Sequence, residues 1–385
     1  MKSVSLSKEG EATAAEPQGF GLSSEQLLQL IDTNVADLIA VIDSNRRRVW
    51  HNEAYCSTFG YSREELANSD SQIKLHPDDL PLVRDAFEVA VQTGVGQKLQ
   101  YRMQAKDGSW IHLESSSQVV DLPEHGRSVI LVARNITDRI RLEQALKKEL
   151  SEAASYIRSL LPTPVDKPVL ADWKFMPSNS LGGDAFFYDW MDDRYFRFGL
   201  LDVCGHGMGA ALLSISAMNC LRAATLPDVD FKSPAQVLAA TNRAYPMEEH
   251  GNRFFTMWYG VYDREDRSLT YGSAGHPGVI LVEESGVLQT LEARGGTIGI
   301  MPDAEYAEER VTLDPRALVY LFSDGVYELR DTSGNEWPFE EFQALLKPQG
   351  DCGEEELERI MQSTREQTGV ENFEDDYSML RLVFR

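Results

Sequence analysis

Four aspartates lie beside apolar stretches in the second half of the sequence, and their side chains have the chemistry of a metal site. They are Asp184 in LGGDAFFYDW, Asp202 in FGLLDVCGHG, Asp324 in LVYLFSDGVYE and Asp375 in FEDDYSMLRLVFR. Each stands where an apolar run is expected to end, and an unpaired carboxylate beside such a core is costly. A divalent cation removes that cost. Hard oxygen ligands without clustered His or Cys favour Mg²⁺ or Mn²⁺ over Zn²⁺ or copper.

A single Asp beside Gly at a strand end is more often a turn former than a metal ligand. Asp202 and Asp324 are the strongest candidates, because each closes a strongly apolar strand and has Gly close behind it. Two glycines precede Asp184. Asp375 is followed by Asp376, and two adjacent acids repel each other unless a cation or solvent relieves them. Four such positions in one segment favour the metal site.

Strands and helices that must position these residues follow one another in the segment 163–385. Strands are predicted around 195–203, 253–263, 268–273, 278–283, 318–323 and 376–384, and helices at about 209–225, 233–246, 339–346 and 354–367. Two sheets packed face to face, with helices outside, would bury these strands and gather the aspartates at one end. The predicted fold of this segment is an αββα sandwich.

The same segment carries a series of motifs in a recognisable order. They are SLLP at 159–162, GGDAFFYD at 182–189, LDVCGHGMGAALLS at 201–214, FFTMWYGVYD at 254–263, LTYGSAGHP at 269–277, GGTIGI at 295–300, LFSDGVYE at 321–328 and DDYSMLRL at 375–382. Through them, residues 163–385 resemble the catalytic domain of metal-dependent Ser/Thr protein phosphatases of type 2C (PPM family), in their bacterial RsbU/SpoIIE-like branch.

This resemblance implies two ions, Mn²⁺ or Mg²⁺, and direct attack of a metal-activated water on phosphorus without a phospho-enzyme. Carried over by motif, Asp202 would bridge both ions and Asp184 would complete one site. Asp324 and Asp375 would hold the other ion. The backbone carbonyl of Val203 is a further expected ligand.

Some positions depart from the family pattern or leave a choice open. Asp-Asp-Tyr-Ser aligns with the family's Asp-Asn/Asp-x-Ser/Thr, which favours Asp375 over Asp376 as the ligand. The better-studied eukaryotic relatives have an acidic pair where this chain has a single acid, Asp184, and an Arg ahead of it where this chain has Ser180 and Leu181. The resemblance therefore implies a weakly held second ion and phosphate recognition mainly by the ions themselves.

Two histidines and one cysteine near the motifs have alternative interpretations. His206 lies four residues after Asp202 and could be a general acid, but a turn residue between glycines is the simpler interpretation. His276, in SAGHPG, is predicted to lie in a turn. Cys204 could be oxidation-sensitive if exposed, although a small buried side chain is favoured.

The stretch 23–137 alternates short strands and helices and lacks the aspartate cluster. Residues 39–43 are predicted to form a strand paired with 46–50, Asn52 to cap or order the next helix, and Asp107 with the following Gly to form a hairpin turn. The segment resembles a PAS sensor domain, which implies an antiparallel sheet with helices on one face. Its ligand is not given by the sequence. His51, His76 and His112 have simple structural roles as alternatives to haem ligation.

Residues 138–162 link the two segments and are rich in helix formers. A short coiled-coil seam with a/d spacing is formed by Leu146, Leu150, Ala153, Ile157 and Leu160. It predicts a parallel homodimer supported by the PAS domains. The alternative is an amphipathic helix that lies on the phosphatase surface.

Composition limits the class of partner. The 385 residues carry a formal charge of −24, which argues against nucleic acid and anionic membranes as partners. Residues 1–22 lack an apolar signal core and are expected to be disordered, and a run of 18 apolar residues does not occur elsewhere, so a cytoplasmic protein is expected. Four irregularly spaced cysteines predict reduced thiols.

The sequence therefore predicts a mixed α+β chain that acts as a PAS-regulated protein serine/threonine phosphatase. Its expected substrate, from the resemblance, is a phosphorylated anti-sigma-factor antagonist. The alternative is a catalytically inactive scaffold, which the presence of all four carboxylates disfavours. A nuclease is disfavoured by the acidic charge.

Overall fold

The computed structural model describes residues 23–385 except 68–69, 73, 167, 179–180 and 348–354. The predicted disorder of residues 1–22 lies outside the described residues. The chain divides into two compact units, Met1–Lys147 and Lys148–Arg385, and each has its own hydrophobic core. None of the described helices is both long and apolar enough to cross a bilayer.

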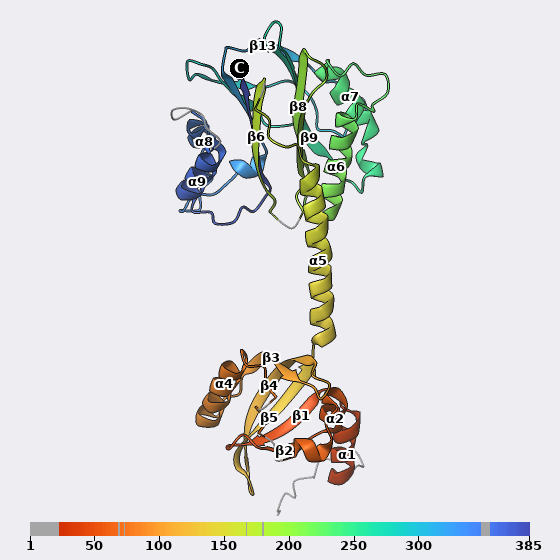
Figure 1. Cartoon of the computed structure of the whole chain (residues 1–385), viewed down its shortest axis with the longest axis vertical. Helices are drawn as coiled ribbons and strands as arrows, with labels where there is room; N and C mark the ends of the chain where they lie inside the picture. The colour runs from red at the N-terminus through yellow and green to blue at the C-terminus, as the bar shows by residue number, and fades with distance from the viewer. Residues whose placement is uncertain (1–22, 68–69, 73, 167, 179–180, 348–354) are drawn as a thin grey trace, which may run out of the picture. The chain divides into compact units, whose positions relative to one another are not determined.

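An antiparallel sheet forms the centre of the first unit (Figure 1), with strand order β2-β1-β5-β4-β3. Its strands are β1 (Leu38–Asp43), β2 (Arg48–His51), β3 (Lys98–Gln104), β4 (Trp110–Leu122) and β5 (Gly126–Asn135). Its helices are α1 (Ser24–Asn34), α2 (Glu53–Phe59), α3 (Arg63–Leu66) and α4 (Leu80–Thr93). The predicted hairpin is confirmed, although its second strand begins two residues later than expected.

Alternation along β1 explains the core of this unit. Leu38 and Ala40 are fully buried, whereas Ile39 between them is only half-buried, because successive side chains of a strand point to opposite faces. Tyr55 and Phe59 of α2 pack into the same core. The predicted antiparallel sheet with helices packed on its face is confirmed.

Asn52 stands at the start of α2, as predicted, but its side chain serves another element. It occupies the N-cap position, but its side chain makes no cap hydrogen bond. Its Oδ1 accepts the backbone N–H of Ile39 at 2.9 Å, and its Nδ2 donates to the carbonyl of Asp37 at 2.9 Å. The buried amide is therefore used to hold the start of β1.

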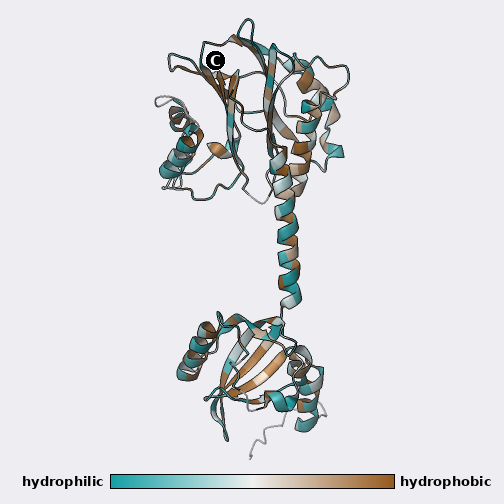
Figure 2. Ribbon diagram, in the orientation of Figure 1, coloured by the Kyte–Doolittle hydropathy of each residue, from teal (hydrophilic) through white to brown (hydrophobic). Residues whose placement is uncertain are grey.

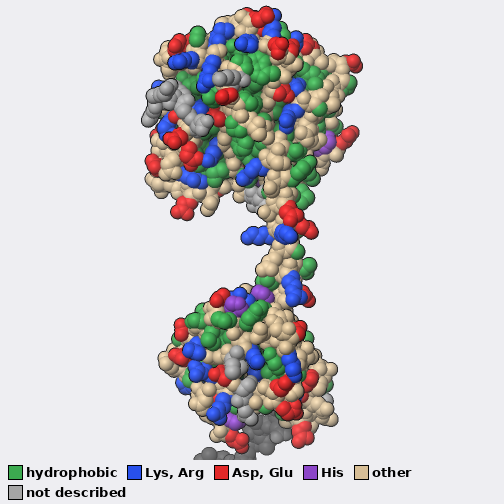
Figure 3. All heavy atoms as spheres, viewed as in Figure 1, with side chains coloured by type: hydrophobic (Ala, Val, Ile, Leu, Met, Phe, Trp, Pro, Cys, Tyr) green, Lys and Arg blue, Asp and Glu red, His purple; other side chains and the backbone are tan. Residues whose placement is uncertain are grey.

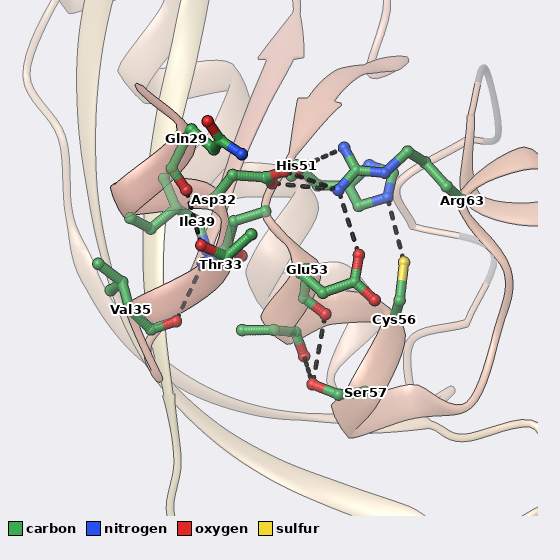
Figure 4. A network of polar contacts seen from close by, with 12 residues as sticks. Gln29, Asp32, Thr33, Val35, Ile39, His51, Glu53, Cys56, Ser57 and Arg63 are labelled. Carbon is green, nitrogen blue, oxygen red and sulfur yellow. Dashed lines mark hydrogen bonds and ion pairs between the residues drawn. The ribbon is translucent and has the colours of Figure 1, made fainter. Parts of the chain in front are cut away.

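Arg63 connects the two N-terminal helices (Figure 4). Its Nη2 donates to Asp32 of α1 at 3.1 Å and to Glu53 of α2 at 3.3 Å, and its Nη1 donates to the carbonyl of His51 at 3.2 Å. His51 lies with Nε2 3.7 Å from Sγ of Cys56, and burial lowers the pKa of its imidazole to about 4. The pocket of this unit that is lined by Ile42, Tyr55 and Tyr101 has no histidine in its described lining.

Helix α5 (Thr137–Leu160) matches the helix predicted for the linker, and the boundary between the two units falls within it. Leu142 and Leu146 are 71% and 58% exposed. Ile157 and Leu160 instead pack against the core of the second unit. The predicted seam is therefore divided, and its C-terminal part is occupied by intramolecular contacts.

Two five-stranded antiparallel sheets form the described core of the second unit, with orders β13-β10-β9-β8-β7 and β12-β11-β14-β15-β6. The strands of the first sheet are β7 (Asp184–Trp190), β8 (Tyr195–Val203), β9 (Phe255–Asp263), β10 (Ser268–Ala274) and β13 (Glu309–Thr312). Those of the second sheet are β6 (Val169–Met176), β11 (Val279–Val282), β12 (Leu288–Leu291), β14 (Ala317–Phe322) and β15 (Tyr377–Phe384).

Helices cover the outer faces of both sheets (Figure 1). Helices α6 (Met208–Arg222) and α7 (Pro234–Ala244) pack on the first sheet, and α8 (Phe339–Leu345) and α9 (Glu356–Thr368) pack on the second. Apolar side chains from the two sheets meet in one core, and Figure 2 shows hydrophobic residues along these strands, interspersed with hydrophilic ones. The predicted αββα sandwich is confirmed. Figure 3 shows acidic and basic side chains interspersed over the visible face of each unit.

Candidate metal centre

The two sheets bring the four aspartates to one end of the sandwich. Asp184 opens β7 and is the direct cross-strand neighbour of Asp202 in β8. Asp324 begins the short 3-10 helix η2 (Asp324–Val326) after β14, and Asp375 lies just before β15. The expectation that Asp184 ends an apolar run is wrong, because the Gly-Gly turn leads into a strand that begins at this residue.

Close backbone approaches hold these loops against one another. A Cβ at Gly325 would lie 2.4 Å from the carbonyl oxygen of Asp376, so the loop after β14 touches the loop before β15. A Cβ at Gly183 would lie 2.8 Å from the carbonyl oxygen of Val203, the predicted backbone ligand. Both positions require glycine because no side chain would fit between the loops.

The acids influence one another electrostatically. Burial, with the nearby Asp324 and Asp375 acting in the same direction, raises the pKa of Asp202 to about 7. Burial and the neighbouring Asp202 also hold the pKa of Asp184 well above its ordinary value. The pKa of Asp324 is raised by burial and then by Asp375. The site therefore concentrates acidic side chains in a poorly solvated part of the protein, where their ionised forms are disfavoured.

Several buried oxygens at this end of the sandwich have no hydrogen-bond partner among the described residues. They are both carboxylate oxygens of Asp184, Oγ1 of Thr256 and Oγ of Ser378. Thr256 is the cross-strand neighbour of Asp202 in β9. A buried polar group without a partner costs about 1–3 kcal/mol, and more when it is charged. This donor set fits a hard divalent cation with its water ligands.

The four carboxylates lie near one another, but their oxygens do not converge on one position. Within the described ranges, no group of three or more His, Cys, Asp or Glu side chains is arranged to hold a metal ion. Asp184 and Asp202 belong to one sheet, and Asp324 and Asp375 border strands of the other. A bridging cation would require their side chains to turn towards one another.

Asp375 and Asp376 have different surroundings. Asp376 is 4% exposed, and its carboxylate accepts the backbone N–H of Ser178 at 2.8 Å and that of Gly183 at 2.5 Å. Asp375 is exposed, its Oδ1 accepts the N–H of Asp376 at 2.8 Å, and it lines an open cleft together with Asp324. Asp376 thus ties the loop between β6 and β7 to the loop before β15, whereas Asp375 faces the cleft.

The loop after β8 turns sharply, as predicted. Gly205 and Gly207 have φ angles of 88° and 87°, which other residues rarely adopt. Cys204 and His206 are exposed on this loop. The prediction of a buried Cys204 is wrong, because the chain leaves the sheet at this residue.

His276 lies in a turn after β10, as predicted, but it is buried. Its Nδ1 donates to the carbonyl of Pro277 at 2.7 Å, and burial lowers the pKa of the imidazole to about 4. The ring is therefore neutral near pH 7, and its place in the turn is structural.

A groove runs between α5 and the loop that precedes Asp184. Its described lining comprises Ser151, Ala154, Ser155, Ile157 and Arg158 of the helix, with Phe175, Pro177, Leu181 and Gly182. This contact agrees with the alternative interpretation of the linker as a helix on the phosphatase surface, for the C-terminal part of α5. The sequence did not indicate the roles of Thr256 and Ser378. In the sequence, Thr256 and Ser378 are marked only by their positions in the FFT and DDYS motifs.

Family comparisons agree with this architecture. The model of the family described as Stage II sporulation protein E (SpoIIE) matches residues 192–385, and a PAS fold model matches residues 48–135. The chain is similar to phosphoserine phosphatase RsbU of Bacillus subtilis (strain 168), with 31% identity over 198 residues, covering 50% of this chain and 57% of RsbU. It is also similar to phosphoserine phosphatase RsbP of the same organism, with 26% identity over 236 residues, covering 60% of this chain and 56% of RsbP.

The chain thus spans little more than half the length of these two relatives. Among solved structures, the SiaA-PP2C domain of Pseudomonas aeruginosa resembles it with a TM-score of 0.55 and 22% identity, over 63% of this chain and 99% of that chain. This likeness concerns the fold.

Proposed function

The chain belongs to the SpoIIE family, and from this premise we propose that it is a PAS-regulated, metal-dependent protein serine/threonine phosphatase. The observation that carries the proposal is the buried carboxylate of Asp184, which has no hydrogen-bond partner among the described residues and stands opposite Asp202. Such a pair needs positive charge beside it. The remaining acids of the site lie at the same end of the sandwich.

The ligands would be the carboxylates of Asp184, Asp202, Asp324 and Asp375 and the carbonyl oxygen of Val203. Carboxylate and carbonyl oxygens are ligands for Mn²⁺ or Mg²⁺, and two such ions are expected from the family. When bound, they supply an activated water as the nucleophile and neutralise the charge of the phosphate.

The chain's own residues would position the ligands. Asp376 holds the loop between β6 and β7 with both carboxylate oxygens, one at Ser178 and one at Gly183. That bonding supports Asp375, which faces the cleft, as the ligand of this adjacent pair. Gly183 and Gly325 allow the loops to approach closely enough for carboxylates from both sheets to converge.

The substrate is inferred from chemistry and from the relatives. RsbU and RsbP are named as phosphoserine phosphatases. A phosphorylated protein fits an open cleft that is accessible from solvent, and the charge of −24 disfavours nucleic acid. We expect phosphoserine or phosphothreonine on an anti-sigma-factor antagonist as the natural substrate, in a cytoplasmic setting.

Regulation would act through α5. The helix lines a groove with Leu181 and Gly182, which immediately precede the loop of Asp184. A sensor event that shifts the helix would therefore move this loop and change the affinity for one ion. The exposed Leu142 and Leu146 support a homodimer through the N-terminal part of the helix and the PAS domains.

Hydrolysis of a phosphoserine peptide by the full chain tests this function. We expect release of phosphate that requires added Mn²⁺ or Mg²⁺, stops in EDTA, and is abolished by Asp202→Asn. Retention of the wild-type rate by this variant would exclude the proposed centre. Absence of turnover by the wild-type chain with either ion, while the phosphopeptide still binds, would favour the scaffold instead.

A further inference from the structure

A single arginine stands among the acids of the cleft. The described lining of this cleft comprises Asp324, Gly325, Glu328, Leu329, Arg330, Val370, Asn372, Glu374 and Asp375. Four of these side chains are acidic, and within that lining only Arg330 is cationic. Two of the acids are proposed metal ligands, so Arg330 shares a surface with the reaction site.

The guanidinium of Arg330 is held at one end. Its Nη1 donates to the carbonyl of Gly334 at 3.0 Å, and its backbone forms a β-bridge with Glu336. The turn that it contacts is ordered by Asp331, whose Oδ1 accepts the N–H groups of Ser333 at 2.8 Å and Asn335 at 2.9 Å. Arg330 thus projects from a short hairpin whose turn is held by Asp331.

The other donors of this guanidinium are available. Arg330 is exposed, and within the described residues it forms no salt bridge, although Glu328 and Glu374 line the same cleft. An arginine has five N–H donors, and a single backbone carbonyl uses one of them. The remaining edge can make paired hydrogen bonds to two oxygens of one anion.

A phosphorylated side chain is such an anion, and the cleft otherwise repels it. A phosphate that carries about −1.5 to −2 charges near neutral pH meets four carboxylates here. Bound cations would offset part of that repulsion, but Glu328 and Glu374 are outside the proposed ligand set. A planar guanidinium matches phosphate geometry better than a lysine ammonium does.

We propose that Arg330 binds the phosphate group of the substrate at the mouth of the metal centre. This proposal rests on the proposed phosphatase function and adds a phosphate-binding residue to it.

The test compares Arg330→Gln and Arg330→Lys with the wild-type full chain. Arg264→Gln is the matched control, because Arg264 is exposed and follows β9 at the end opposite to Thr256. Four quantities are measured for each protein: kcat and KM for a phosphoserine peptide, the inhibition constant of inorganic phosphate, the Mn²⁺ concentration for half-maximal activity, and the melting temperature.

For Arg330→Gln we expect kcat/KM to fall about tenfold or more and the inhibition constant of phosphate to rise by a similar factor, as for loss of a charged hydrogen bond. Arg330→Lys should recover part of both effects, since the charge remains but the paired geometry is lost. The Mn²⁺ requirement should not rise. Arg264→Gln should resemble the wild type.

An unchanged inhibition constant of phosphate in Arg330→Gln would overturn the proposal, whether or not KM for the peptide rises. A lower melting temperature with full loss in Arg330→Lys would show that the arginine only supports the hairpin. Both results leave the phosphatase function intact, because the wild-type chain is still active. An inactive wild-type chain would instead remove the proposed function and this proposal with it.

Discussion

Asp202 is a carboxylic acid that its surroundings make difficult to ionise. Burial, together with Asp324 and Asp375, raises its pKa from an ordinary value of 3.8 to about 7. A group with a raised pKa in the folded state adds stability while it is protonated, and that stability is lost as the pH rises through the folded pKa. Without a cation, the folded protein therefore carries an increasing cost between about pH 4 and pH 7.

Asp202→Asn should remove this cost. In EDTA we expect the variant to be more stable than the wild type at pH 8 by on the order of 2–4 kcal/mol, with the difference shrinking towards pH 4. Urea unfolding of both proteins between pH 4 and pH 8 measures the difference. A free-energy difference that is constant across this range would show that Asp202 is not strained in the metal-free fold.

Substitution of the adjacent acids Asp375 and Asp376 should affect different properties, activity for Asp375 and stability for Asp376. Asp376→Ala leaves the N–H groups of Ser178 and Gly183 without their acceptor, so we expect a loss of about 2–4 kcal/mol in the free energy of unfolding. Asp375→Asn should unfold nearly as the wild type does but lose metal-dependent activity. Urea unfolding and phosphopeptide assays separate the two effects. Equal destabilisation by both changes would argue against this division of roles.

The sequence indicated the acids of the site but not their neutral neighbours. Four carboxylates beside apolar strands would be costly without a cation to neutralise them, so the sequence alone identifies them as candidate metal ligands. Thr256 and Ser378 are ordinary strand residues whose importance comes only from pairing across the sheets. Cys204 was placed wrongly because local composition does not show where a chain leaves a sheet.

At the scale of elements, the most apolar strands were predictable, and the strands missed have identifiable features. β12 and β13 are four-residue strands at sheet edges, and at least half of the residues in each are polar, in LQTL and ERVT. β6 and β7 are also edge strands. β6 contains Asp172 and Lys174, and β7 begins with an acid after two glycines. Edge strands can form with less apolar sequence because only part of their surface is buried, which fits β6, β12 and β13. β7 is different, because its residues after Asp184 are apolar and buried.

Helix α5 tests the proposed route of regulation. Ile157 packs on the core of the second unit and lines the groove beside Leu181 and Gly182. We expect Ile157→Ala to loosen the loop of Asp184 and to weaken the apparent Mn²⁺ affinity by about 0.5–2 kcal/mol. Activity as a function of Mn²⁺ concentration measures this change.

Tyr156→Ala is the control for that experiment, since its side chain is 66% exposed one residue away. It should leave the Mn²⁺ dependence unchanged. If both variants match the wild type, the groove does not carry the signal to the metal centre.

At the scale of the whole molecule, the linker should also set the oligomeric state. Leu146 is 58% exposed on α5 and belongs to the predicted seam, whereas Lys147 lies beside it outside the seam. We expect the full chain to be a dimer at micromolar concentration and Leu146→Asp to shift it towards the monomer. Lys147→Asp should stay dimeric. Sedimentation velocity measures the oligomeric state of each protein. A monomeric wild-type chain would contradict dimerisation through the predicted seam.

The central claim is that these four carboxylates hold divalent cations, and a Mn²⁺ titration followed by electron paramagnetic resonance tests it most directly. We predict that the full chain binds about two Mn²⁺ ions, one more weakly than the other. Asp202→Asn should lose both, and Asp184→Asn should lose one. Mn²⁺ binding that is the same in the wild type and in both variants, or that is absent from the wild type at millimolar Mn²⁺, would contradict the account.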